Sequence, residues 1–208
     1  MKLLILGVTG GIGLEIVRQA IDRGHQVTAF VRTPAPLKEF VDRITVIQGD
    51  VLHSAGLERA LEGQDAVLSS FGAREPRSKA HADLLRRFAV ALTRAMLHAK
   101  IRRVVVVSVA FLFKDSIFPP AYLFGRLFFR DTVIDASGME DVFRKSELDW
   151  TIVRPPQLTD KPRTGKYRVR EGHLPRFGFT ISRADVAECF IKTVNDRASV
   201  GKILGVSN

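Results

Sequence analysis

Short apolar runs alternate with amphipathic segments along most of the chain. The runs span four to six residues and are rich in Val, Ile and Leu, which is typical of parallel strands buried on both faces. Between them, apolar residues recur three or four positions apart, which is the period of a helix packed on one face. The pattern predicts strands at residues 3–6, 26–31, 44–48, 66–70, 104–107, 150–153 and 202–206, and helices at 11–23, 54–63, 78–99, 131–145 and 182–194.

Several predicted helices carry residues that start or stop a helix. Gly24 follows the first helical segment at the position where a left-handed glycine commonly closes a helix. Ser54 is placed to cap the second helix. Ser182 and Asp185 have the spacing of a capping box at the start of the last one.

This alternation predicts an α/β fold, a Rossmann doubly wound parallel sheet of about seven strands with helices on both faces. A length of 208 residues suits one NAD(P)-binding domain over residues 1–208, since no linker or repeat interrupts the pattern. Two stretches lack either period, at about 111–130 and 155–180, and both follow strand ends. Such folds bind ligands beyond the carboxyl ends of the strands, so we expect these two stretches to be substrate-site loops.

Composition narrows the class of protein. The single cysteine, Cys189, rules out an intrachain disulfide and fits a reducing compartment. No apolar run is long enough to cross a membrane and the N-terminus does not resemble a signal peptide, so we expect a cytoplasmic protein without a membrane span. The net charge of +10 attracts anions of any kind, from phosphates and cofactors to nucleic acids.

A glycine-rich turn follows the first strand and opens the first helix. Gly7 permits a tight turn, Gly10 lets a pyrophosphate approach the backbone, and Gly13 allows the helix to pack closely on the strand. The free amides of the helix start favour phosphate, and Thr9 can add a hydroxyl. A purely structural turn is the alternative. The residues expected to contact the cofactor here are Gly7, Thr9, Gly10, Gly11, Ile12 and Gly13.

The end of the second strand bears on the choice between NADPH and NADH. NAD-binding proteins usually place a carboxylate there for the ribose hydroxyl, whereas this chain has Arg32, whose guanidinium suits a 2′-phosphate. We therefore expect NADPH. An alternative is a solvent-facing Arg32 with either cofactor accepted.

Further cofactor contacts are expected after the third and fourth strands. Asp50 and Val51 are placed to meet the adenine, although a loop aspartate can instead make a local turn bond. Phe71 and Gly72 follow the fourth strand, where Gly72 permits close approach. Arg74 can reach the phosphates or an anionic substrate, with a surface role equally open.

These motifs together resemble a known family. The chain is similar over essentially its whole length to the atypical short-chain dehydrogenases of the biliverdin-IXβ reductase and flavin reductase group, which are NmrA-like NAD(P)-binding proteins. The resemblance implies NADPH-dependent reduction of flavins or linear tetrapyrroles. It rests on Gly-x-Thr-Gly-x-x-Gly at 7–13, Val31-Arg32, Gly49-Asp50-Val51, residues 63–67, Gly72-Ala73-Arg74, Ala110-Phe111-Leu112, Pro155-Pro156, Thr164-Gly165-Lys166-Tyr167 and residues 181–186.

Two positions depart from the family pattern. The family has a serine directly before Ala-Phe-Leu, whereas here that position is Val109 and the hydroxyl comes one residue earlier, at Ser108. A shift of one residue on a strand points the side chain to the other face, so Ser108 reaches the nicotinamide if the strand has already ended. The tetrapyrrole reductase has a histidine where this chain has Gln157. Ser108 and Gln157 are the candidate catalytic residues, and Ser108, Pro155 and Pro156 are expected to contact the cofactor.

Aromatic residues crowd the segment after the fifth strand. They are expected to form an apolar slot over the nicotinamide, with Phe111, Phe113, Tyr122 and Leu158 contacting the substrate. Core packing is the alternative for any single phenylalanine, and a dimer or membrane-surface patch is another. No Tyr-x-x-x-Lys pair is present, because Arg126 follows Tyr122 and Glu171 follows Tyr167, which disfavours alcohol oxidation by a tyrosinate base.

The sequence thus favours an NADPH-dependent reductase that uses flavin as a substrate rather than as a tightly bound cofactor. A non-catalytic NADP(H)-binding sensor or scaffold of the NmrA-like type is the main alternative, and a sugar or isoprenoid epimerase is a weaker one. The histidines show no metal-ligand spacing, so no metal is expected. Nucleic-acid binding would rest on charge alone and is not expected. The expected partner is a small flat conjugated acceptor, with the protein a monomer or weak homodimer.

Overall fold

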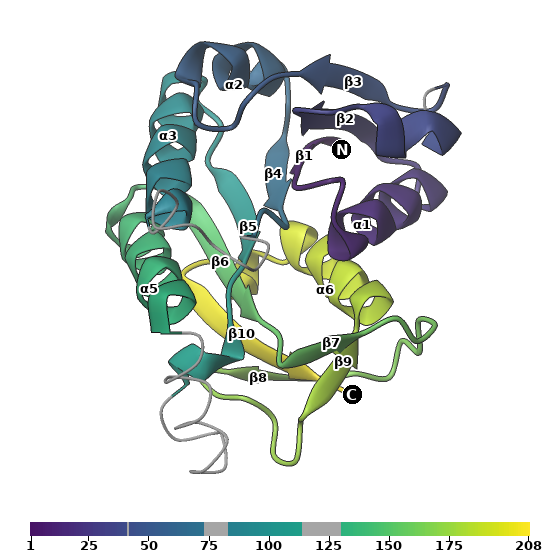
Figure 1. Cartoon of the computed structure of the whole chain (residues 1–208), viewed down its shortest axis with the longest axis vertical. Coiled ribbons are helices and arrows are strands. Elements are labelled where there is room, and N and C mark those ends of the chain that lie inside the picture. Colours follow the sequence, from purple (N-terminus) through teal and green to yellow (C-terminus); the bar gives the residue numbers. More distant parts are fainter. Residues whose placement is uncertain (41, 73–82, 114–129) are drawn as a thin grey trace.

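An eight-stranded sheet organises the computed structural model, which describes residues 1–40, 42–72, 83–113 and 130–208. Its strand order is β3-β2-β1-β4-β5-β6-β10-β8 (Figure 1), and β8 is antiparallel to β10 while the other neighbours are parallel. A separate parallel pair joins β7 and β9. The strands are β1 Lys2–Leu6, β2 Gln26–Val31, β3 Thr45–Gln48, β4 Ala66–Ser69, β5 Arg103–Val107, β6 Asp149–Arg154, β7 Gln157–Thr159, β8 Arg168–Glu171, β9 Thr180–Ser182 and β10 Lys202–Ser207.

Helices cover both faces of the sheet (Figure 1). Alternate residues of β1 show the two layers, because Leu3 and Ile5 join the core under α1 and α6 while Leu4 and Leu6 join the core under α2, α3 and α5. The helices are α1 Gly11–Asp22, α2 Ser54–Leu61, α3 Leu84–His98, α5 Arg130–Lys145 and α6 Arg183–Asn195, with short 3-10 turns η1 Ala35–Phe40, η3 Ala110–Leu112 and η4 Arg197–Ser199.

The Rossmann prediction is confirmed. Seven parallel strands lie where the apolar runs predicted them, and the predicted helices are present, with residues 78–82 of the third one outside the described residues. Gly24 closes α1 with a φ of +74°. The Oγ of Ser182 accepts from the amide of Asp185 and caps α6, as the capping box predicted.

Two predictions about local structure were wrong. Ser54 is the first residue of α2 and not its N-cap, because His53 occupies that position. The segment 155–180 is not irregular throughout, since it contains β7 and β8. The exposed strand β8 lacks an apolar period because it lies at the edge of the sheet with all four side chains exposed, and its hydrogen bonds to β10 hold it there.

Polar side chains tie neighbouring helices and neighbouring strands together. The carboxylate of Asp135 in α5 accepts from the amides of Leu85 and Arg86 at 2.9 and 3.0 Å, and so satisfies the start of α3. At the amino end of β5, the guanidinium of Arg103 donates to the carbonyl of Asp149 and the hydroxyl of Thr151, both at 2.8 Å. The Asp135 contacts hold α5 to α3, and the Arg103 contacts hold β5 to β6 at the amino end of the sheet, away from the carboxyl ends of the strands.

Candidate functional site

The glycine turn between β1 and α1 is built by two glycines that packing requires. Gly7 has a φ of +75°, and a Cβ placed on it would lie 2.6 Å from the backbone nitrogen of Phe71. A Cβ on Gly13 would lie 2.2 Å from the carbonyl oxygen of Gly7. Any side chain at either position would separate the turn from the end of β4 or from the start of α1.

Gly10 is different, because protein packing does not require it. The nearest described atom to a Cβ on Gly10 is the carbonyl oxygen of Gly7, at 3.4 Å. Gly10 is the N-cap of α1, and a glycine has no side chain that can accept from the amides of the first turn. The helix start, with Gly11 and the buried Ile12, therefore presents its donors to space that a pyrophosphate can fill.

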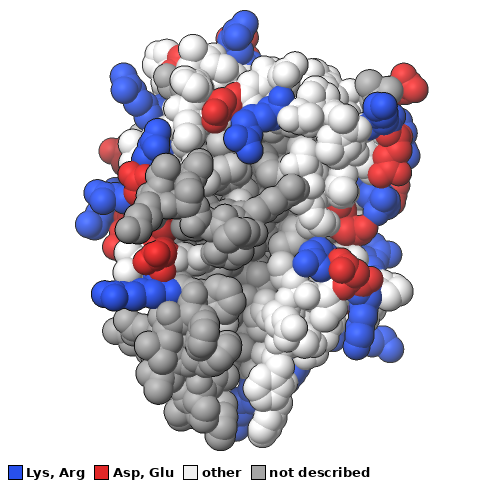
Figure 2. Space-filling view, viewed as in Figure 1, with Lys and Arg blue, Asp and Glu red and all other residues white. Residues whose placement is uncertain are grey.

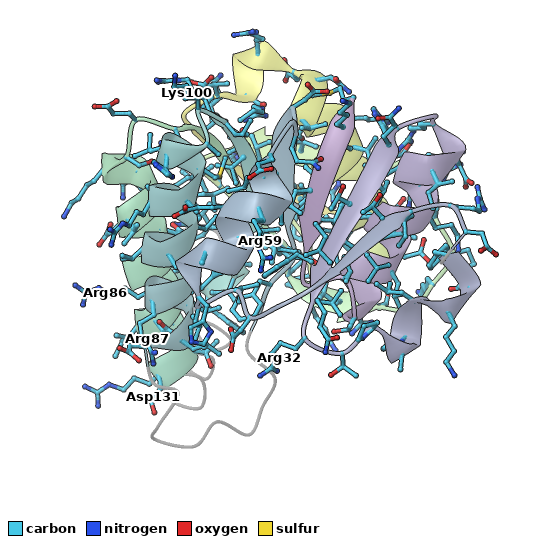
Figure 3. The ribbon with its side chains drawn as sticks, turned by 90° about the horizontal axis from the view of Figure 1, so that it is seen from above. Arg32, Arg59, Arg86, Arg87, Lys100 and Asp131 are labelled. Atoms are coloured by element: carbon cyan, nitrogen blue, oxygen red, sulfur yellow. The ribbon has the colours of Figure 1, made fainter. Side chains whose placement is uncertain are left out.

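The adenosine end of the predicted site lies at the ends of β2 and β3. Arg32 is exposed directly after β2, and its carbonyl accepts from the side-chain amide of Gln48 at 3.0 Å. Figure 3 shows Arg32, Arg86 and Arg87 toward one end of the molecule and Lys100 toward the opposite end. Asp131 lies at the same end as these arginines, so this end of the molecule carries charges of both signs, with Arg32 directly after the carboxyl end of β2.

Asp50 makes the local turn bond that the sequence allowed. Its Oδ1 accepts from the amide of Leu52 at 2.9 Å, and its Oδ2 lies 3.9 Å from Nδ1 of His53. Val51 is buried in the core under α2. The preceding Gly49 leaves room for the ring of Phe30, 2.4 Å from where a Cβ would stand.

Phe71 and Gly72 approach the turn from the end of β4. The ring of Phe71 packs against Phe88, with centroids 4.6 Å apart, so its backbone rather than its ring faces Gly7. No described atom lies within 4 Å of a Cβ built on Gly72. Arg74 lies outside the described residues.

Ser108 stands immediately beyond the end of β5. Along β5, successive side chains alternate between the two cores as far as Val107. Val109 then packs in the same core as Val106, so the alternation ends at Ser108. Ser108 is 7% exposed, and its Oγ is buried with no hydrogen-bond partner among the described residues. A buried hydroxyl without a partner is costly, and among the described residues the side-chain oxygens of Gln64, Thr93 and Glu188 share this condition.

The proline pair lies beside Ser108. The amide of Ser108 donates to the carbonyl of Val153 at 2.8 Å, and that of Ala110 donates to the carbonyl of Pro155 at 3.2 Å. Pro155 is buried and Pro156 half-buried. Gln157 is exposed next to them, at the start of β7, and Leu158 packs against the core under α1 and α6.

The predicted aromatic slot is described only in part. Phe111 is half-buried, while Phe113 is 2% exposed, with the guanidinium carbon of Arg154 4.6 Å from its ring centroid. Arg154 also donates to the carboxylate of Glu140 in α5 through two nitrogens, the Nε bond being 2.8 Å long. This buried pair fixes the end of β6 ahead of the prolines. Tyr122 lies outside the described residues.

Sequence reasoning missed Arg154, Glu140 and two aromatic residues. Phe177 and Phe179 are 85% and 63% exposed in the loop before β9. The carbonyl of Phe179 accepts from the amide of Gln157 at 3.3 Å, so this loop adjoins the candidate catalytic glutamine. Phe177 has a φ of +57°, which is unfavourable for an aromatic residue. Backbone strain of this kind is most often found at ligand sites and switch regions.

Asp185 anchors the second predicted substrate loop. Its Oδ1 accepts from the amides of Thr164 and Gly165, and its Oδ2 accepts from the Thr164 hydroxyl, the Ser182 hydroxyl and the amide of Asn208, at 2.8 to 2.9 Å. Burial alone would raise the pKa of Asp185, but the hydrogen bonds from Asn208, Gly165 and Thr164 outweigh it and lower the pKa. Asp185 is therefore an ionised structural centre.

Two other reactive groups are unsuited to catalysis. Burial raises the pKa of the Cys189 thiol to about 11, so the thiolate is scarce at neutral pH. Burial likewise raises the pKa of Tyr167 above its ordinary value, with Cys189 and Glu188 adding to the shift. Tyr167 therefore does not supply a tyrosinate base.

The NAD(P)H-binding family model matches residues 7–197. The chain belongs to the NAD(P)H-binding family. YwnB, an uncharacterised protein of Bacillus subtilis, is 29% identical over 175 residues, which cover 81% of this chain and 78% of YwnB. This family match agrees with the resemblance to atypical short-chain dehydrogenases that the sequence showed.

Solved structures share the fold over the whole chain. A short-chain dehydrogenase/reductase from Veillonella parvula in complex with NADP has a TM-score of 0.85 at 22% identity, covering 100% of this chain and 94% of that one. ChuY, an anaerobillin reductase from Escherichia coli O157:H7, has a TM-score of 0.81 at 20% identity, covering 100% and 97%. Both likenesses establish the Rossmann architecture.

The residues of this NAD(P)H-binding protein fit the cofactor. In the part of the chain that the structure describes, the start of α1 has no side-chain cap and the Oγ of Ser108 has no hydrogen-bond partner, and both lie at the carboxyl edge of the sheet, where Rossmann folds bind ligands. Among the described residues, no group of His, Cys, Asp and Glu is arranged to hold a metal ion, and no helix is long and apolar enough to cross a membrane. On the face in Figure 2, the basic side chains of the described residues are dispersed with acidic ones among them and form no continuous stripe.

Proposed function

We propose that this protein is an NADPH-dependent reductase of flavins or similar flat conjugated acceptors, among which a linear tetrapyrrole is a candidate. The observation that carries the proposal is the buried Oγ of Ser108, which has no hydrogen-bond partner among the described residues and lies near Pro155 at the carboxyl edge of an NAD(P)H-binding sheet. When bound, NADPH supplies a hydride from nicotinamide C4.

The chain's own residues bind and orient. The amides at the start of α1 hold the pyrophosphate, Arg32 pairs with the 2′-phosphate, and Ser108 donates or accepts a hydrogen bond at the nicotinamide end. Pro155 and Pro156 exclude water from that end. Stacking two flat rings in reactive contact is the main demand of flavin reduction, since water can supply the proton.

Phe177 and Phe179 support a flat acceptor. Both rings are exposed, the backbone of Phe179 pairs with that of Gln157, and aromatic faces favour offset stacking on conjugated ligands. Gln157 is then the side chain that can hydrogen-bond polar groups of the acceptor.

Turnover is tested by following NADPH absorbance with FMN, FAD, a quinone and biliverdin supplied separately. The proposal expects oxidation with at least one acceptor and little with the Ser108→Ala and Phe179→Ala variants. Wild-type protein that binds NADPH but oxidises it with none of these acceptors would refute the reductase.

A second candidate function is a non-catalytic NADP(H) sensor or scaffold. The observation that favours it is Val109 at the family's serine position. Tight NADP(H) binding without oxidation, together with a partner protein whose association depends on the bound cofactor, would select this function.

A further inference from the structure

Arg183 reaches from α6 to the glycine turn. It is the first residue of α6, and its side chain is 30% exposed. A Cβ built on Gly11 would lie 2.5 Å from Cδ and 2.9 Å from Nε of Arg183. The missing side chain at Gly11 thus makes room for the arginine at the first turn of α1.

This placement puts two positive groups together. The start of a helix carries a partial positive charge, and its first amides need acceptors. A guanidinium laid on it is repelled unless an anion lies nearby. The acidic partner of Arg183 among the described residues is Asp160, whose Oδ1 lies 2.6 Å from NH1 and whose side chain is 89% exposed.

The ion pair between Arg183 and Asp160 contributes little to holding Arg183 in place. An exposed aspartate beyond the end of β7 is well solvated, so its ion pair with Arg183 adds little stability and can be exchanged. A pyrophosphate at the start of α1 would offer the guanidinium two charged phosphates and would remove its repulsion from the helix.

We propose that Arg183 is a phosphate-binding residue that exchanges Asp160 for the pyrophosphate of NAD(P)H. The inference rests on the cofactor site of the proposed function but does not depend on the identity of the acceptor. It assigns different phosphates to the two arginines: Arg32 to the 2′-phosphate found only in NADP(H), and Arg183 to the pyrophosphate shared by both cofactors.

The test compares dissociation constants of wild type, Arg183→Met, Arg32→Met and the control Arg144→Met, whose arginine also pairs with an aspartate, Asp141, but on α5. Arg183→Met should raise the constants for NADPH, NADH and ADP-ribose alike, roughly tenfold, as expected for one charge-assisted hydrogen bond. It should leave 2′-AMP binding unchanged, since 2′-AMP has no pyrophosphate. Arg144→Met should change none of them.

Asp160→Asn provides the opposite perturbation. Removing the competing carboxylate should tighten NADPH binding about threefold, consistent with the small value of an exposed ion pair. In a separate variant, Arg183→Lys keeps the positive charge and should retain part of the wild-type affinity.

A double-mutant cycle guards against misfolding. Gly11→Ala displaces the intact arginine, so it should weaken NADPH binding more in wild type than in an Arg183→Ala background. Equal effects in the two backgrounds would overturn the contact.

Different results would overturn this inference and the proposed function. Unchanged NADPH and NADH affinities in Arg183→Met, or a loss confined to NADPH, would overturn this inference while leaving the cofactor site intact. Wild-type protein that binds neither cofactor would overturn the proposed function and this inference with it.

Discussion

Replacing Asp185 with asparagine tests how the site loops are held. Asparagine keeps one carbonyl oxygen for the amides of Thr164 and Gly165, but its NH₂ group replaces Oδ2, which accepts from three side chains. The two hydroxyls can rotate to accept instead, whereas the amide of Asn208 then faces another donor.

The magnitude follows from those contacts. One hydrogen bond to a charged group is lost, at about 1.5–3 kcal/mol, and one buried donor is left unsatisfied, at about 1–3 kcal/mol. We expect the free energy of unfolding to fall by about 3 kcal/mol at pH 7, which corresponds to a Tm about 6–12 °C lower for a chain of this size.

The pH dependence identifies the charge as the cause. Because the folded pKa of Asp185 is lowered, its contribution is present above the ordinary aspartate pKa of about 3.9 and is lost as the pH falls through the folded value. Urea unfolding at pH 7, 5 and 3.5 should therefore show a constant gap between wild type and Asp185→Asn at the two higher values and a smaller gap at pH 3.5. The reasoning is refuted if the gap is the same at all three values.

Three further changes probe the rest of the site. Arg32→Ser should weaken NADPH about tenfold and leave NADH unchanged by titration, because only NADPH carries the 2′-phosphate; equal losses would contradict that role. Ser108→Ala should leave Tm unchanged or slightly higher, since it removes a buried hydroxyl that has no partner among the described residues. The same variant should lower turnover roughly tenfold, and unchanged turnover would exclude Ser108 from the reaction. Arg154→Met should lower the free energy of unfolding, measured in urea, by about 3–5 kcal/mol, because it leaves the Glu140 carboxylate buried without its partner. The double variant Glu140→Gln, Arg154→Met should recover part of that loss, and no recovery would argue against the ion pair.

Local patterns of residues were enough to predict the fold and its glycine turn. Apolar runs and helical periods are local properties, so the strands from β1 to β6 and β10 could be read directly, as could the cap of α6 at Ser182. Gly7 and Gly13 were identifiable for the same reason, because a tight strand-to-helix turn imposes its own backbone demands.

Features that depend on neighbours far apart in the sequence could be seen only in the folded protein. Whether Ser108 follows the strand or belongs to it depends on where β6 stops pairing with β5, and β8 forms because β10 offers it an edge. Arg183 is far from Gly11 in the sequence, and Arg154 and Glu140 lie on different elements. The sequence around a charged residue does not show which residue it will pair with in the fold. The sheet brings these groups together, since parallel strands collect their carboxyl ends at one edge whatever their order along the chain.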